Sequence, residues 1–117
     1  MRRSTLAYLA DIVDACDSIA EVLADVDLAT YGERRPIRSA VEREFIIVGE
    51  AAAALSRLEP VLFSRITHGR RIVDFRNQLT HEYPHVDDRI VWLIARDDVP
   101  VLRAECAAML ADMGDAD

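Results

Sequence analysis

The 117-residue sequence contains no lysine, so all 14 of its basic side chains are arginines. It has only two cysteines, Cys16 and Cys106, which are too far apart for a Cys-x-x-Cys motif or a disulfide framework. Only four glycines and four prolines interrupt a chain that is 51% apolar. This composition is too hydrophobic for disorder and sufficient for one globular core, so we expect a single domain over 1–117 with both cysteines in its core.

Long hydrophobic runs are also missing. The most apolar stretch, 45–55, contains Glu50 in its middle and is far too short to span a membrane. Near the beginning of the chain, Asp11, Asp14 and Asp17 interrupt what would have to be the hydrophobic region of a signal peptide. These features predict a soluble, cytoplasmic protein.

Negative charge predominates, but it is unevenly distributed. The formal net charge is −7, which argues against the basic surface that is usual in nucleic-acid-binding proteins. Residues 1–33 carry two arginines and seven acids, residues 34–76 nine arginines and five acids, and residues 77–117 three arginines and nine acids. Solvated helix faces with salt bridges would explain this pattern. A dimer that joins two central segments would instead form a basic cleft in an acidic body.

Apolar residues recur at spacings of three and four, which predicts helices. We expect the first helix over about 5–26, with Ser4 as its N-cap. Its apolar stripe consists of Leu6, Leu9, Val13, Cys16, Ala20, Leu23 and Val26. A connector over 27–35, with Gly32 as its turn residue, leads to a second helix over about 36–58 that Pro36 begins.

The remaining sequence predicts further helices and no strand. A weak helical turn around 61–63 precedes a helix over about 70–81. Asp87 or Asp88 caps the next helix, and Pro100 lies in the first turn of the last one. No segment has a period of two residues, so the fold class is all-α: an antiparallel bundle of four to five helices. Within the second helix, Gly49 and the alanines that follow Glu50 would let a neighbouring backbone approach closely.

The end of the 70–81 helix is unusually polar. Arg76, Asn77 and His81 lie just before the helix-breaking pair Tyr83-Pro84. Asn77 and His81 are four residues apart and share a helix face, whereas Arg76 and His81 are about 140° apart. A guanidinium beside an imidazole suits phosphate chemistry, because one neutralises charge and the other moves a proton. The same residues would equally suit a helix C-terminus, where cations interact with the helix dipole.

The spacing Arg76-x4-His81-x-Tyr83 resembles the motif of the HepT-like toxins, a branch of the HEPN (higher eukaryote and prokaryote nucleotide-binding) superfamily. The similarity extends along nearly the whole chain, in order. It includes Tyr8-Leu9 with Asp11-Ile12, Ala40–Arg43 with Ile47–Ala52, the motif itself, and Asp87 with Ile90–Trp92 followed by Asp98–Leu102. Members of the family often have a tryptophan where this chain has His68-Gly69.

The resemblance implies the toxin of a type VII toxin–antitoxin system, a metal-independent endoribonuclease that needs no cofactor and acts as a homodimer with an HEPN-like fold. On this model His81 is the general acid or base, Arg76 stabilises the transition state and Asn77 orients the phosphate. The implied partners are RNA and a minimal nucleotidyltransferase antitoxin, which can neutralise the toxin by transferring AMP to Tyr83. Negative charge two residues from His81 would repel RNA.

Glu50 lies in a mainly apolar stretch, where a buried carboxylate is costly unless it is paired. It either reaches solvent, pairs with an arginine, or supports the site by orienting Arg76 or lining a dimer cleft.

The three histidines, His68, His81 and His85, do not form a helical pair of independent metal ligands on one face, and loop positions suit them better, so we expect no metal site. Tyr8 and Tyr31 could stack on bases, although core or rim positions suit them better, and Trp92 is expected in the core.

Two other functions fit parts of the sequence. A non-catalytic helical subunit that presents substrate or nucleotide to a separate nucleotidyltransferase suits the net charge of −7 better. A purely structural dimerisation module would explain the helices but not the cluster from Arg76 to Tyr83.

Overall fold

The computed structural model describes residues 2–81 and 86–115, and side chains are described from Thr5 to Gly114 within these ranges. Helices account for most of this part of the chain, and no strand occurs in it. The helices are α1 (Arg2–Val22), α2 (Leu28–Glu33), α3 (Arg35–Leu58), α4 (Pro60–Phe63), α5 (Gly69–His81), α6 (Asp88–Asp97) and α7 (Val99–Asp115). The all-α prediction is therefore confirmed.

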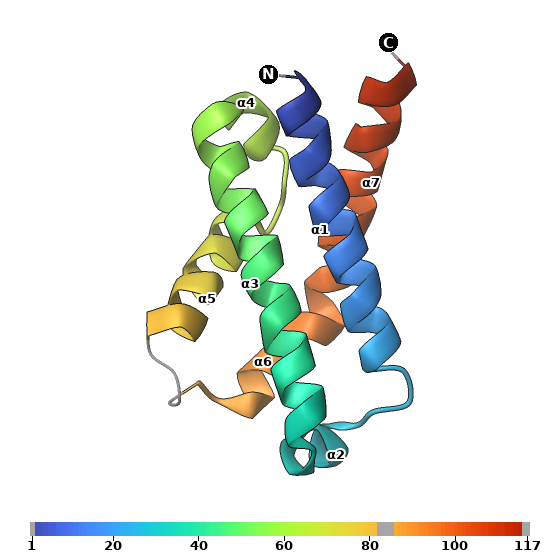
Figure 1. The fold of residues 1–117 in the computed structure, drawn as a ribbon, viewed down its shortest axis with the longest axis vertical. Helices are drawn as coiled ribbons and strands as arrows, with labels where there is room; N and C mark the ends of the chain where they lie inside the picture. Colours follow the sequence, from blue (N-terminus) through green and yellow to red (C-terminus); the bar gives the residue numbers. More distant parts are fainter. Residues whose placement is uncertain (1, 82–85, 116–117) are drawn as a thin grey trace.

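The five longer helices form an elongated antiparallel bundle of 46 × 28 × 19 Å. Figure 1 shows α3 between α1 and α5, while α7 packs on the other side of α1 and α6 crosses behind α3. The two short helices, α2 and α4, lie at opposite ends of α3. None of the described helices is both long and apolar enough to cross a membrane.

Two predictions about the beginning of the chain are wrong. The first helix begins at Arg2, so Ser4 is not its N-cap, and it ends at Val22 instead of continuing to 26. A turn follows in which Asp25 has a φ of 62°, a left-handed conformation that a helix cannot contain. The predicted connector contains α2, which Asp27 caps by accepting a hydrogen bond from the backbone N–H of Thr30 at 2.8 Å. Gly32 lies inside this helix and makes no turn.

Other helix boundaries are as predicted. Pro36 lies in the first turn of α3, and Pro100 is the second residue of α7. Asp87 caps α6, since its carboxylate accepts a hydrogen bond from the backbone N–H of Arg89 at 2.8 Å. Tyr83-Pro84 lies outside the described residues, immediately beyond the end of α5.

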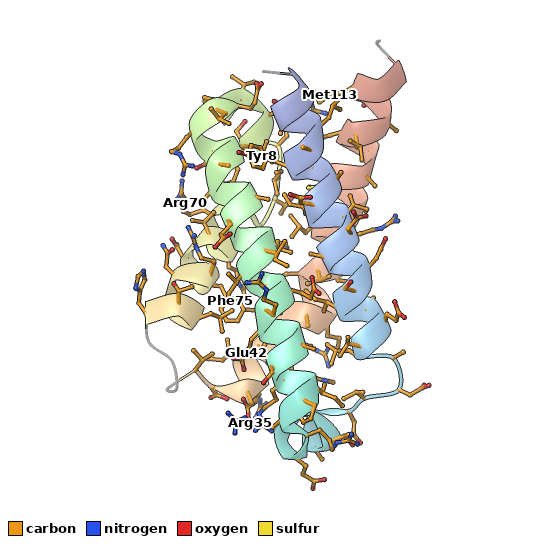
Figure 2. The ribbon with its side chains drawn as sticks, in the orientation of Figure 1. Tyr8, Arg35, Glu42, Arg70, Phe75 and Met113 are labelled. Atoms are coloured by element: carbon orange, nitrogen blue, oxygen red, sulfur yellow. The ribbon has the colours of Figure 1, made fainter. Side chains whose placement is uncertain are left out.

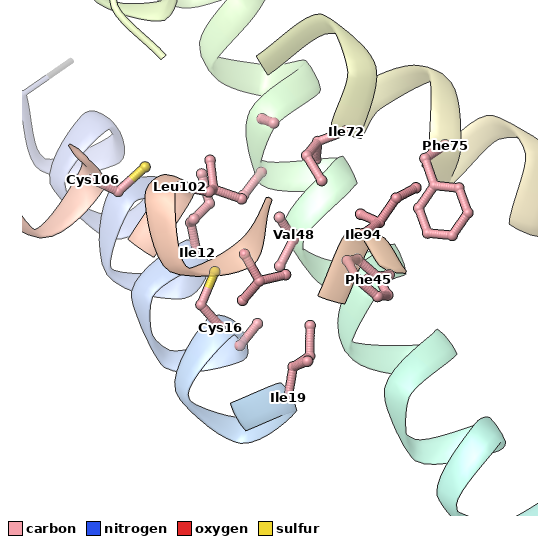
Figure 3. Packing of buried hydrophobic residues seen from close by; sticks show 14 of the residues in the cluster. Ile12, Cys16, Ile19, Phe45, Val48, Ile72, Phe75, Ile94, Leu102 and Cys106 are labelled. Atoms are coloured by element: carbon pink, nitrogen blue, oxygen red, sulfur yellow. The ribbon is translucent and has the colours of Figure 1, made fainter. Parts of the chain in front are cut away.

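A single hydrophobic core joins α1, α3, α5, α6 and α7 (Figure 3). The buried face of α1 differs from the predicted stripe: Ile12 and Ile19 are buried, whereas Val13 is half-buried and Ala20 is exposed. The reason is that α1 packs against both α3 and α7, so its apolar surface faces the region between them.

Cys16 and Cys106 are free thiols buried in the core, as predicted. Burial raises the pKa of Cys16 to about 12, and Cys106 adds to this shift. Burial likewise raises the pKa of Cys106 to about 12, with a contribution from Glu105. Both thiols therefore remain protonated at neutral pH and behave as small apolar residues.

Tyr31, Trp92 and Tyr8 lie in the hydrophobic core or pack against it. Tyr31 is fully buried, and its hydroxyl has no hydrogen-bond partner in the described part of the chain. Burial raises its pKa, and Glu42 and Asp88 add to the shift. Trp92 is half-buried at the edge of the core, where its indole N–H donates to the Val26 carbonyl at 3.4 Å. Tyr8 is also half-buried, so none of the three is a fully open stacking surface.

Candidate active site

One face of α5 anchors it in the core. Ile72, Val73, Phe75 and Leu79 are buried, and Phe75 meets Phe45 of α3 edge to face, with ring centroids 5.1 Å apart. Figure 2 shows Phe75 turned toward α3 and Arg70 on the outer side of α5. Because the apolar face fixes the rotation of the helix, it also fixes where the polar residues point.

Gly49 of α3 is the point of closest approach to Arg76. A methyl group added to Gly49 would overlap the Cβ and Cγ atoms of Arg76 and lie 3.5 Å from its Cα. Only glycine leaves room for this crossing, which agrees with the predicted close approach at Gly49. The position of Arg76 is therefore set by helix packing within the core.

The guanidinium group of Arg76 is incompletely satisfied. Its Nε atom is buried, yet it has no hydrogen-bond partner among the described residues, and the side chain as a whole is only half-buried. A buried N–H on a permanently charged group normally has an acceptor, because leaving it unpaired costs about 1–3 kcal/mol or more. Arg76 is thus suited to bind an anion that reaches the open part of its side chain.

Asn77 and His81 lie on the exposed side of α5, and His81 is its last residue. In the last turn the Thr80 hydroxyl donates back to the carbonyls of Arg76 and Asn77, at 3.1 and 3.2 Å. The structure brings Asn77 and His81 onto one face, while Arg76 points toward α3. Tyr83 lies outside the described residues.

Glu50 reaches solvent and forms no ion pair in the described part of the chain. It follows Gly49 on α3 and lines a hollow of about 300 Å³ between α1 and α3, with Tyr8, Asp11 and Arg57. It therefore does not orient Arg76 by a direct ion pair within the described chain. The remaining functional possibility is that it faces a second molecule.

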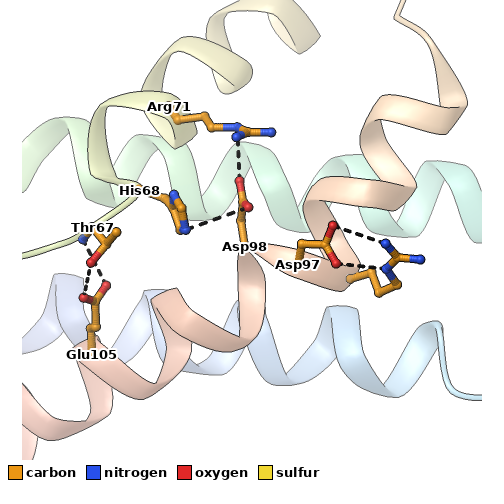
Figure 4. A network of polar contacts seen from close by, with 7 residues as sticks. Thr67, His68, Arg71, Asp97, Asp98 and Glu105 are labelled. Carbon is orange, nitrogen blue, oxygen red and sulfur yellow. Dashed lines mark hydrogen bonds and ion pairs between the residues drawn. The ribbon is translucent and has the colours of Figure 1, made fainter.

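Sequence reasoning missed a polar network at the beginning of α5 (Figure 4). Asp98 is only 5% exposed; its carboxylate lies 3.1 Å from Arg71 Nε and 3.9 Å from His68 Nε2. The Arg71 contact is an ion pair without hydrogen-bond alignment, since that carboxylate oxygen has no aligned donor. Just before it, Thr67 donates from its backbone N–H and its hydroxyl to Glu105, at 3.0 and 2.6 Å.

The network had only a weak signal in the sequence, namely the adjacent arginines Arg70 and Arg71 at the beginning of a helix. Their partners lie outside α5: the Arg70 guanidinium lies over the ring of Phe63, 5.6 Å from its centroid, and Arg71 meets Asp98, 27 residues further along the chain. Among the residues that the structure describes, no cluster of three or more His, Cys, Asp or Glu could hold a metal ion. His85 lies outside these residues.

In comparisons with known proteins, a family model and individual relatives indicate the same family. A family model described as ribonuclease HepT-like matches residues 12–109. A relative from Methanocaldococcus jannaschii, an RNase by name, is 30% identical over 89% of this chain and 94% of its own length. A relative from Thermococcus cleftensis, named as a ribonuclease HepT, is 29% identical over 90% of this chain and 94% of its own. No solved structure gives a significant match. The chain belongs to the ribonuclease HepT-like family.

Proposed function

We propose that this protein is an endoribonuclease whose reacting groups are Arg76, Asn77 and His81. The observation that carries the proposal is the Nε atom of Arg76, which is buried without an acceptor among the described residues, on the same helix that ends in an exposed histidine. Membership of a family named for ribonucleases supports RNA as the substrate. A guanidinium that binds an anion and an imidazole that can transfer a proton are the two groups that phosphodiester cleavage needs.

In the proposed reaction, the ribose 2′-oxygen attacks the adjacent phosphorus. His81 either takes the 2′-hydroxyl proton, while water protonates the leaving 5′-oxygen, or delivers a proton to the 5′-oxygen, while water takes the 2′-hydroxyl proton. A bond forms between the 2′-oxygen and phosphorus while the bond to the 5′-oxygen breaks, leaving a 2′,3′-cyclic phosphate and a 5′-hydroxyl. Arg76 stabilises the extra negative charge of the transition state, and Asn77 hydrogen-bonds the phosphate. These steps use only protein side chains and water, so the proposal includes activity without a metal ion.

We also propose that the active form is a homodimer. The outer face of α3 carries Arg43, Glu50 and Arg57 at intervals of seven residues, or about two helical turns. All three residues are exposed, and none forms an ion pair within the described residues. Between them lie the half-buried Ile46 and Ile47 and the small residues Ala53 and Ala54, which are themselves only 7% and 5% exposed. Alternating charges and apolar side chains favour an antiparallel copy of the same face.

A two-fold axis between Ala53 and Ala54 pairs Glu50 of each copy with Arg57 of the other. The alanines allow a close approach, and Ile46 then lies opposite the end of the other α3. At that end Leu58 and Val61 are 40% and 79% exposed, the latter an unusual position for valine. In this arrangement Glu50 has a role at the interface, next to the Gly49–Arg76 crossing.

The charge pattern provides a direct test of the dimer. Arg57→Glu places two carboxylates opposite each other, so we expect sedimentation equilibrium to show a monomer. The double variant Glu50→Arg/Arg57→Glu exchanges both charges and should restore the dimer. Arg89→Glu, at another exposed arginine without an ion pair in the described chain, is the matched control. If the double variant remains monomeric, this interface is wrong.

The family context supports a pairing with an antitoxin. We propose that a minimal nucleotidyltransferase neutralises the toxin by transferring AMP to the Tyr83 hydroxyl, in a type VII toxin–antitoxin system. The hydroxyl oxygen would attack the α-phosphorus of ATP, releasing pyrophosphate. The added phosphodiester would lie two residues beyond His81 and would both fill the site and repel RNA. Intact mass after co-expression should show one AMP adduct per chain, which Tyr83→Phe abolishes.

The decisive experiment is RNA cleavage by protein made without its antitoxin, in the presence of EDTA. We expect His81→Ala and Arg76→Ala each to lower the cleavage rate by about 100-fold or more while the far-UV circular dichroism remains helical. Product ends with a cyclic phosphate would support the mechanism. Unchanged RNA with wild-type, unmodified protein would overturn it.

The alternative function is a non-catalytic binding subunit of a two-component nucleotidyltransferase. The net charge of −7 favours it. It predicts that nucleotide binds only when both subunits are present and that Tyr83 stays unmodified. Calorimetric titration of each subunit and of the mixture distinguishes this function from a ribonuclease.

A further inference from the structure

A second hollow lies between α5 and α6, away from the α1–α3 face. Its volume is about 460 Å³, and it is lined by polar and apolar side chains in comparable number: Arg70, Arg71, Asp74, Gln78, Phe75, Ile90 and Ile94. Ile90 is 48% exposed, which leaves an open apolar surface beside the polar groups. Neither α3 nor Arg76 contributes to its lining.

The hollow lies on the same side of α5 as His81. At 100° per residue, Arg70, Asp74, Asn77 and His81 fall within about 60° of one another around the helix. Eleven residues separate Arg70 from His81, so the rise of 1.5 Å per residue places them about 16 Å apart along the axis. A ligand that passes His81 and follows α5 toward its beginning therefore reaches this hollow.

The two arginines are held in place before any ligand binds. Arg70 lies over the Phe63 ring, and Arg71 contacts the buried Asp98 while its side chain remains 59% exposed. A guanidinium that is anchored on one side loses less conformational entropy when its remaining N–H groups bind an anion. Asp74 disfavours an anion beside it, so the phosphate contacts belong at the Arg70–Arg71 end.

The chemistry of the hollow fits a single nucleic-acid strand. Guanidinium groups bind backbone phosphates, an amide such as Gln78 hydrogen-bonds sugar or base edges, and an apolar wall takes the face of a base. Residues 65–76 contain four arginines and one acid, which makes this the locally basic part of an acidic protein. A metabolite with a single charge would leave much of this lining unused.

We propose that the hollow between α5 and α6 binds the RNA strand on one side of the cleaved phosphodiester. Arg70 and Arg71 contact a backbone phosphate a few nucleotides from the reacting one, Gln78 hydrogen-bonds the strand, and Ile90 contacts a base. This inference rests on the proposed ribonuclease function and assigns residues outside the motif to substrate binding. It makes cleavage depend on substrate length.

Substrate length is therefore the variable to test. Arg70→Gln removes one charge without breaking the Arg71–Asp98 pair; Arg89→Gln is the matched control, because Arg89 is exposed and does not line the hollow. For an oligonucleotide of about 10 nucleotides we expect Arg70→Gln to raise KM about tenfold, the usual effect of one charged hydrogen bond. For a dinucleotide, which is too short to extend from His81 to Arg70, KM should not change. Gln78→Ala should act in the same direction, more weakly.

Binding separates this inference from the proposed function. Fluorescence anisotropy with the His81→Ala variant measures RNA affinity in the absence of cleavage, and Arg70→Gln should lower both the affinity and its salt dependence. If the wild type binds RNA through Arg70 but does not cleave it, RNA binding in the hollow is supported and the ribonuclease proposal fails. Equal effects on long and short RNA, no effect on either, or an altered sedimentation coefficient would overturn the hollow as an RNA site. The last outcome would assign it to a protein contact.

Discussion

The charged side chains in the two halves of α5 differ in their contacts, although the helix is continuous. In the first half, Arg70 lies over Phe63 and Arg71 pairs with Asp98, next to the Thr67–Glu105 hydrogen bonds. In the second half, Arg76, Asn77 and His81 have no ion pair within the described residues, although Arg76 has a buried Nε atom.

Arg70 and Arg71 make contacts that stabilise the fold, whereas Arg76 keeps a buried N–H without an acceptor in the described part of the chain. A partnered guanidinium lowers the free energy of the native state by itself, whereas an unpartnered one leaves part of its desolvation cost uncompensated. Such an uncompensated group is frequent at functional sites, where the ligand supplies the missing partner. The charged groups of the first half therefore stabilise the fold, whereas on the proposed function Arg76 in the second half contacts the RNA.

The largest loss of stability should come from Gly49→Ala, because this substitution disturbs the contact with Arg76 that positions the second half of α5. The added methyl group overlaps the Arg76 stem, so either α5 moves or Arg76 changes its rotamer. We expect a loss of about 1–3 kcal/mol in the free energy of unfolding, measured by urea denaturation.

Gly32→Ala is the matched control for this substitution. Gly32 also lies within a helix, and an added methyl group there would meet nothing within 4 Å. Alanine should stabilise that helix by up to about 1 kcal/mol. Equal effects of the two substitutions would contradict the close crossing at Gly49.

The next prediction compares the two kinds of arginine. Methionine keeps the apolar stem and removes the guanidinium. Among the described residues, Arg71→Met leaves the buried Asp98 with the His68 contact at 3.9 Å alone, so we expect a loss of about 1 kcal/mol, reduced by the exposure of Arg71. Arg76→Met removes an unpaired buried N–H and should leave stability unchanged or slightly higher, while RNA cleavage is lost.

Chemical denaturation of both variants beside the wild type measures this contrast. A destabilised Arg76→Met variant with a stable Arg71→Met variant would show that the two halves have the opposite roles.

The smallest loss of stability is expected for a substitution that affects the segment before α5. Glu105→Ala removes both hydrogen bonds to Thr67, at an exposed position, and should cost about 1 kcal/mol or less. Amide hydrogen exchange should accelerate in the first turn of α5 and remain unchanged around Asn77. Asp112→Ala, at an exposed acid on the same helix, is the control. Faster exchange along the whole of α5 would mean that the two halves are not independent.

Local patterns in the sequence were sufficient for much of the fold. The spacing of apolar residues and the prolines placed α3 and α5 within one residue of their observed ends. The predicted end of α1 was wrong because apolar residues at 23 and 26 continue the helical spacing into a turn. The helix between Leu28 and Glu33 was missed because it is only six residues long, too short for an apolar period, and contains Gly32, a residue of low helix propensity.

The surroundings of the candidate residues could be predicted only in part. The sequence proposes Arg76, Asn77 and His81 as site residues, and the small residues of α3 predict a close approach. That Gly49 meets Arg76 depends on how two distant helices cross, which no local pattern determines. The pairing of Arg71 with Asp98 was invisible for the same reason.

The crossing at Gly49 also bears on how proteins of this kind can diversify. Because Arg76 is located by a core contact, substitutions on the outer face of α5 leave its backbone where it is. Residues such as Arg70 and Gln78 are then free to change from one lineage to another, altering which ligands are preferred, while the arginine at the crossing stays fixed. In an alignment of relatives, position 49 should therefore tolerate fewer residue types than any position on that outer face.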